Sequence, residues 1–224
     1  MTPRDPDQRD ATAPAPDAPI LRAALFLDLA GVLLDTAPGS SPRHAQLRPQ
    51  LRDQALSRLP GLRGGVGAAL RLLERLDYRI IVLAPCTLDR RQAGRMLPDR
   101  VADLLARERV ELAGCYCCAT AHAPCPACPP SPALLLRAAR EHDLALPASW
   151  LLARDVHHLA AGQRAGCRTL QIGTDGAGAG ADADAGADKA WAPALAVGAD
   201  GPAAYQARDI VDAALAIVQL DGKR

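Results

Sequence analysis

The stretch Ala24-Leu25-Phe26-Leu27-Asp28-Leu29-Ala30-Gly31 decides the fold of this chain of 224 residues. It begins as a short apolar run, which is typical of a strand buried on both faces of a sheet. The run ends at one carboxylate, Asp28, and Gly31 follows as a residue that lets the chain turn. In open α/β sheets, ligands bind beyond the carboxyl ends of the strands. Asp28 is therefore a candidate functional residue, although an Asp at the end of a strand can also simply cap a turn.

Segments with the periodicity of strands and of helices alternate along the rest of the chain. Strands are predicted at about 22–29, 78–83, 110–116, 150–153, 167–172 and 194–197, and helices at 65–76, 88–106 with an interruption around Pro98, 133–142, 159–165 and 207–220. Such alternation indicates parallel βαβ units, and hence one doubly wound parallel sheet of the α/β class.

Three segments have the composition of loops or tails. Residues 1–20 are rich in Pro, Asp and Ala and have little to bury, so we expect a disordered N-terminal tail before a single domain at 21–224. Within that domain, 117–132 is a loop rich in Cys and Pro, and 174–188 is a low-complexity loop of Gly, Ala and Asp.

The overall composition excludes several classes of partner. The formal net charge is +1, which argues against a nucleic-acid or membrane surface. No run is long and apolar enough to span a bilayer, and the acidic, Pro-rich start of the chain does not have the pattern of a secretory signal. We therefore expect a cytoplasmic protein, in which a cluster of cysteines favours metal binding over disulfides.

Four motifs follow one another between about residue 23 and residue 173. They are Asp28-Leu29-Ala30-Gly31-Val32, then Leu59-Pro60-Gly61 with the helix and strand after it, then the loop from Tyr116-Cys117-Cys118 to Cys128-Pro129-Pro130, and finally Ala153-Arg154-Asp155 with Ala161-Gly162 and Ala165-Gly166. This order resembles the haloacid-dehalogenase-like (HAD) superfamily, and within it the heptose-bisphosphate and histidinol-phosphate phosphatases. The resemblance implies a HAD-like, Rossmannoid α/β domain with a short Cys-rich insertion and no large cap domain.

The resemblance also implies roles for individual residues. In that family the first Asp of the first motif attacks phosphorus, and this position is Asp28 here. A magnesium ion would be held by Asp28, the backbone carbonyl of Ala30 and Asp155.

Other positions depart from the family pattern. The general acid of the family is Ala30 here, the hydroxyl at the end of the second strand is Ala84, and the second acid of the last motif is Leu159. No Lys occurs between Met1 and Asp188, so the family's Lys has no counterpart. Losing a positioned acid or base typically costs about 100- to 10,000-fold in rate. The pattern favours a phosphatase fold whose active site is weakened or retired.

Two residues are candidates for replacing the lost phosphate contacts. Thr87 could supply a hydroxyl, although a helix N-cap before Leu88 is the simpler interpretation. Arg154 could supply positive charge, and it would then either weaken magnesium binding by repulsion or replace the cation outright. Its alternative is a solvated surface residue, as it is for the neighbouring pair His157 and His158.

The Cys-Pro loop contains a candidate zinc site. Cys118, His122, Cys125 and Cys128 have a spacing that lets one loop surround a tetrahedral ion. Zinc bound in this way would be structural, because no coordination position is left open. The alternative is a loop of free or buried thiols.

Three functions remain open from the sequence. The first is a HAD-like protein that has lost most or all phosphatase activity and binds a small phosphorylated metabolite or an unidentified protein partner. The second is an active magnesium-dependent phosphomonoesterase that acts through Asp28 on a phosphorylated sugar or histidinol phosphate. The third is an interaction module stapled by zinc.

Overall fold

In the computed structural model, residues 21–34, 61–84, 90–117, 126–173 and 204–222 are described, with only the backbone for 90–96 and 204. One parallel sheet of six strands has the order β3-β2-β1-β4-β5-β6. The strands are β1 (Ala24–Asp28), β2 (Arg79–Ala84), β3 (Leu112–Cys117), β4 (Trp150–Ala153), β5 (Arg168–Ile172) and β6 (Ala204–Ala207). The helices are α2 (Val66–Glu74), α3 (Arg90–Arg107), α4 (Ala133–Glu141), α5 (Val156–Ala165) and α6 (Ile210–Asp221), with short turns at η1 (Leu29–Leu33) and η3 (Leu146–Ala148).

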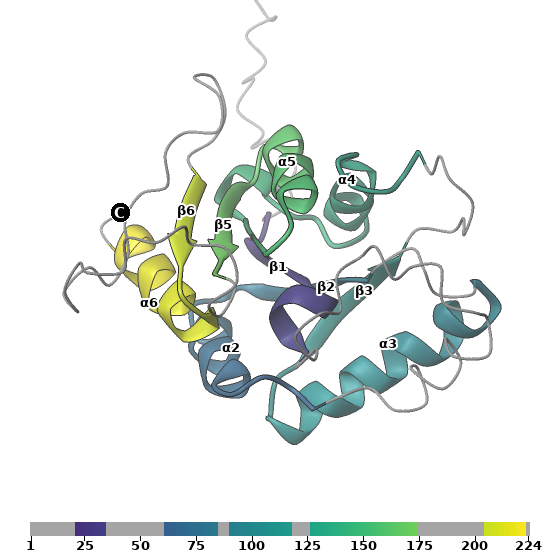
Figure 1. The fold of residues 1–224 in the computed structure, drawn as a ribbon, viewed down its shortest axis with the longest axis horizontal. Helices are drawn as coiled ribbons and strands as arrows, with labels where there is room; N and C mark the ends of the chain where they lie inside the picture. Colours follow the sequence, from purple (N-terminus) through teal and green to yellow (C-terminus); the bar gives the residue numbers. More distant parts are fainter. Residues whose placement is uncertain (1–20, 35–60, 85–89, 118–125, 174–203, 223–224) are drawn as a thin grey trace, which may run out of the picture.

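Helices cover both faces of the sheet. Helices α4 and α5 lie over one face and α2, α3 and α6 over the other, as Figure 1 shows. Side chains of β1 alternate between the two layers, because successive residues of a strand point to opposite faces. Ala24 and Phe26 pack on the side of α4 and α5, whereas Leu25 and Leu27 pack on the side of α2 and α6. By the same alternation, Asp28 faces the layer that contains α5.

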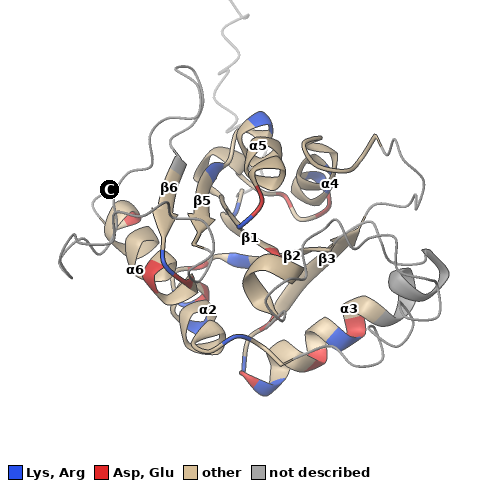
Figure 2. Ribbon diagram, viewed as in Figure 1, with Lys and Arg blue, Asp and Glu red and all other residues tan. Residues whose placement is uncertain are grey.

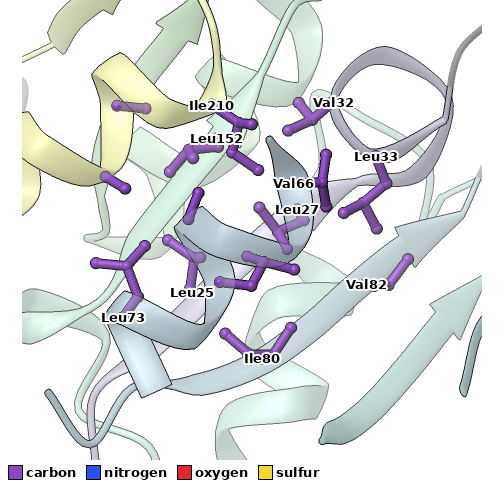
Figure 3. Packing of buried hydrophobic residues seen from close by; sticks show 14 of the residues in the cluster. Leu25, Leu27, Val32, Leu33, Val66, Leu73, Ile80, Val82, Leu152 and Ile210 are labelled. Carbon is purple, nitrogen blue, oxygen red and sulfur yellow. The ribbon is translucent and has the colours of Figure 1, made fainter. Parts of the chain in front are cut away.

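The larger core lies between the sheet and α2, α3 and α6 (Figure 3). Leu25, Leu27 and Leu152 of the central strands are fully buried there. Val66 of α2 and Ile210 of α6 close the cluster from outside. This packing holds the central strands, and therefore their carboxyl ends, in fixed positions.

The amino ends of the strands are joined by a polar network around Asp221, the last residue of α6. Its carboxylate accepts hydrogen bonds from Tyr78, from Trp150 Nε1 at 3.2 Å and from Arg168 Nη2 at 2.8 Å. The guanidinium of Arg168 also lies over the ring of Trp150, with Cζ 4.1 Å from the ring centroid. The network fixes the end of α6 against three strands.

Most predicted elements within the described residues are confirmed, and the prediction for the helix around Pro98 needs correction. The helix predicted to be interrupted around Pro98 is continuous, since α3 runs through Pro98. Leu97, Val101 and Leu105 are buried, and this burial outweighs the hydrogen bond that a proline cannot donate. The last strand is β6, at Ala204–Ala207, whereas the predicted strand at 194–197 lies outside the described residues. The predicted tail at 1–20 and the loop at 174–188 lie outside them too.

Acidic and basic residues are interspersed over the described helices (Figure 2). None of the described helices is both long and apolar enough to pass through a membrane.

Candidate active site

The candidate site lies where the order of the strands reverses direction. Chain order runs outward from β1 through β2 to β3 on one side, and from β4 through β5 to β6 on the other. Open α/β sheets bind ligands at such a switch point, beyond the carboxyl ends of the strands. Asp28 ends β1, while Arg154 and Asp155 directly follow β4, its neighbour in the sheet. The two predicted carboxylates are therefore brought to the same edge.

Asp28 is buried, with 6% of its surface exposed. Burial raises the pKa of its carboxyl, because the charged form loses hydration. The positive charge of His158 opposes this rise in pKa, as do the backbone N–H groups of Ala30 and Gly31, which donate to the carboxylate. The negative charge of Asp155 adds to the rise in pKa. The net result is a carboxyl that holds its proton more tightly than usual.

Gly31 allows the chain to pass close to the Asp28 carboxylate. A Cβ atom at position 31 would lie 2.6 Å from Oδ2 of Asp28, and 3.2 Å and 3.3 Å from Cγ and Cβ of Arg154. A side chain at position 31 would therefore displace one of the two. The side-chain stem of Arg154 and the carboxylate of Asp28 thus lie on either side of the position that a Cβ of residue 31 would occupy. Only a glycine at position 31 leaves room for both.

Asp155 forms the N-cap of α5. Its Oδ1 accepts a hydrogen bond of 2.7 Å from the backbone N–H of His157, which satisfies one of the free N–H groups at a helix start. The helix therefore begins at Val156, earlier than the predicted start at 159, and both histidines belong to its first turn. His157 is exposed, as predicted for a surface pair, but His158 is half-buried.

His158 was not recognised as a site residue from the sequence. Its Nδ1 is buried and has no hydrogen-bond partner within the described ranges, and its charge acts on Asp28. One signal could have revealed it. Residues three apart lie on the same face of a helix, so Asp155 as N-cap would have placed His158 toward the site.

Two positions at which the family resemblance implies polar groups, those of the hydroxyl and of the second acid, carry apolar side chains here. Ala84 is buried at the end of β2, beside β1, and Leu159 is buried in α5. Thr87, the predicted substitute for the hydroxyl, lies outside the described residues.

The oxygen donors present are of the kind that magnesium takes. Magnesium is usually held by one or two carboxylates and completes its shell with water and phosphate oxygens. Asp28 and Asp155 are close enough for the charge of one to raise the pKa of the other, and a cation between them would relieve that repulsion. These two carboxylates are therefore a donor set that would suit a magnesium ion.

The structure does not test the predicted zinc site. Cys118, His122 and Cys125 lie outside the described residues, and Cys128 is disulfide-bonded. A sulfur in a disulfide is not a thiolate and cannot bind zinc as one, so a zinc site that includes Cys128 requires this loop to be reduced. Among the described residues, no group of three or more His, Cys, Asp or Glu side chains could hold a metal ion.

Comparison with known proteins identifies the fold. No protein-family model matches the sequence, and no curated protein matches it either. Among solved structures, an HAD-like phosphatase of Mesorhizobium loti is 22% identical with a TM-score of 0.60, over 90% of this chain and 88% of that chain. The D,D-heptose 1,7-bisphosphate phosphatase of B. bronchiseptica, solved with magnesium and phosphate, is 16% identical with a TM-score of 0.62, over 88% of this chain and 99% of that chain.

These similarities define the class of architecture. The chain has the HAD-like fold, a single α/β sheet domain of the Rossmann type, as the order of its motifs predicted. A HAD-superfamily hydrolase of Ehrlichia chaffeensis, 12% identical with a TM-score of 0.53 over 90% of this chain and 98% of that chain, has the same fold. At these identities the similarity describes the fold alone, so the activity has to be argued from the site.

Proposed function

We propose that this HAD-fold protein binds a small phosphorylated ligand at the edge that contains Asp28, and hydrolyses it slowly or not at all. One observation supports both parts. Asp28 stands buried at the switch point, while the positions of the acid, the hydroxyl and the second acid carry Ala30, Ala84 and Leu159. The chain thus has the candidate nucleophile at the switch point but lacks most of the groups that would complete the reaction. An unidentified protein partner is the alternative ligand.

The remaining groups suit the binding of an anion. Arg154, whose side-chain stem lies beside Asp28, carries a permanent positive charge that a bound phosphate could meet, and Thr87 is the further proposed phosphate contact. The raised pKa of Asp28 reduces the repulsion between its carboxyl and a phosphate, because the carboxyl holds its proton more tightly than usual. The same shift lowers the fraction of Asp28 that is ionised and able to attack phosphorus.

The alternative is a magnesium-dependent phosphomonoesterase, for which His158 is the favouring observation. An active enzyme needs a proton donor to replace the acid missing at Ala30, and an imidazole beside the nucleophile is of the right type. His158 has a buried, unpartnered Nδ1 and acts electrostatically on Asp28. Magnesium, when bound by Asp28, the carbonyl of Ala30 and Asp155, would neutralise charge on the phosphate oxygens.

Phosphate release from heptose 1,7-bisphosphate and from histidinol phosphate, with magnesium present, tests the proposal. The control is Asp28→Asn, which removes the nucleophile and keeps the shape. We expect no release above that variant, together with measurable binding of at least one phosphorylated compound by calorimetry. Release that disappears in Asp28→Asn would establish the phosphomonoesterase instead.

The proposed setting follows from composition. We infer a cytoplasmic protein without nucleic-acid or membrane partners, supported by the formal net charge of +1.

A further inference from the structure

Arg154 carries a permanent positive charge, and the stem of its side chain lies beside Asp28. It precedes Asp155 in the chain. A Cβ atom added at Gly31 would lie 3.3 Å from Cβ and 3.2 Å from Cγ of Arg154, and 2.6 Å from Oδ2 of Asp28. Its backbone is also held, because Gln171 Nε2 of β5 donates a hydrogen bond of 3.3 Å to its carbonyl oxygen. The side chain of Arg154 therefore starts beside the Asp28 carboxylate, within reach of a ligand bound there.

That charge is not neutralised within the part of the chain that the structure describes. None of the salt bridges between described residues includes Arg154. Asp155 uses Oδ1 to cap α5, and Asp28 accepts from the N–H groups of Ala30 and Gly31. The guanidinium, which stays charged at any working pH, is therefore available to whatever approaches the site.

The consequences for the two kinds of ligand are opposite. A divalent cation between Asp28 and Asp155 would sit near a fixed like charge, which lowers its affinity. An anionic group would meet a guanidinium whose donors match the oxygens of a phosphate. A bound anion would offset the repulsion between the guanidinium and the cation, and because coupling is reciprocal the cation would improve binding of the anion by the same factor.

We propose that Arg154 makes this an anion-first site, in which a phosphate group binds without a divalent cation and the cation binds weakly until the anion is present. This inference rests on the proposed function, since it assumes that a phosphorylated ligand binds at the Asp28 edge. It goes beyond that function by assigning the charge that holds the ligand to the protein itself.

Calorimetry with inorganic phosphate in excess EDTA is the first test. The wild-type protein is compared with Arg154→Gln, with Arg154→Lys, and with Arg75→Gln, which removes an exposed charge beyond the C-terminal end of α2. We expect phosphate to bind the wild type and Arg75→Gln equally. Arg154→Gln should bind about tenfold more weakly, and Arg154→Lys should fall between them, because a charge-assisted hydrogen bond is lost or changed. Thermal unfolding of each variant verifies that it is folded.

Titration with manganese, followed by electron paramagnetic resonance, is the second test. We expect about tenfold tighter manganese binding by Arg154→Gly and Arg154→Gln than by the wild type. Phosphate should tighten manganese binding by the wild type more than by the variants. Equal manganese affinity in all proteins, or phosphate binding that requires the metal and ignores Arg154, overturns this inference and leaves the proposed function standing. Failure of inorganic phosphate and of the phosphorylated compounds to bind under any condition overturns the proposed function as well.

Discussion

Asp28 and Asp221 are two carboxylates at opposite ends of the strands: Asp28 lies at the carboxyl ends and Asp221 at the amino ends. Their surroundings differ in kind. Asp221 is partly buried and has three hydrogen-bond donors from side chains, among them the guanidinium of Arg168. Burial by itself would raise its pKa, but the bonds from Arg168, Tyr78 and Trp150 outweigh burial and hold the pKa below the usual value. Burial and the bond to Asp221 in turn raise the pKa of Tyr78 to about 12.

Asp28 is more deeply buried and has fewer donors. The charge of His158 and the N–H groups of Ala30 and Gly31 oppose the effect of burial but do not cancel it, so its pKa stays raised. The two carboxylates differ in how many hydrogen-bond partners the chain provides, and this difference follows their roles. A structural carboxylate is supplied with partners from this chain, whereas the carboxylate at the candidate site is left short of them, as is expected where a ligand supplies the remainder.

The largest expected effect is on the structural carboxylate. Asp221→Ala leaves the guanidinium of Arg168 without its partner, and the side chain of Arg168 is only 14% exposed. We expect a loss of about 2–3 kcal/mol in the free energy of unfolding, measured by urea denaturation followed through Trp150 fluorescence.

The control is an ion pair within α4 in which both partners are exposed. Arg137 pairs with Glu141 at 2.8 Å, and the two side chains are 55% and 48% exposed. Arg137→Ala should therefore cost less than about 1 kcal/mol. Equal losses in the two variants would show that the network at the amino edge contributes no more than a surface ion pair.

The difference between the two edges also explains what could be predicted from the sequence. Asp28 and Asp155 were predictable, because each lies within two residues of the end of a short apolar run and the carboxyl ends of parallel strands meet at one edge. The Asp221 network was not, because Tyr78, Trp150, Arg168 and Asp221 are far apart in the chain and meet only through tertiary packing.

His158 is an intermediate case, because whether its side chain faces the site depends on the residue at which α5 begins. With its N-cap at Asp155, that helix starts three residues before the predicted start. The prediction missed this first turn because the pair His157 and His158 gives no apolar signal. Similarly, β6 was missed because Ala204–Ala207 is a short strand at the edge of the sheet without β-branched residues.

Replacing the candidate nucleophile should stabilise the fold. The pKa of Asp28 is raised, so the folded state binds its proton more tightly than the unfolded state does. The stability from this group is fully present below the unfolded pKa, about 4, and is lost as pH rises through the folded pKa. Asp28→Asn has no such loss. We expect it to exceed the wild type at pH 7 by on the order of 1 kcal/mol, with the gap closing as pH falls toward about 4.

Denaturation of both proteins across this pH range measures the gap. Asp221 contributes in the opposite sense, because its pKa is lowered and its stability is lost only at acid pH. That contribution is common to the wild type and Asp28→Asn and therefore cancels in the difference between them. A variant less stable than the wild type at pH 7 would contradict the picture of a carboxylate left short of partners.

The smallest expected effect separates the two histidines of α5. His158→Gln removes the charge that opposes the rise in the pKa of Asp28, so the pKa of Asp28 should move further up in this variant. His157→Gln is the matched control, because His157 is exposed on the same turn of the helix and is not among the groups that shift the pKa of Asp28.

Titration of the Asp28 carboxyl carbon by NMR measures the pKa of Asp28 in both variants. Each variant should change the free energy of unfolding by less than about 1 kcal/mol. If both variants shift the titration equally, the histidines act only as surface charge. A shift confined to His158→Gln places its imidazole at the site, where its charge opposes the effect of burial on the pKa of Asp28.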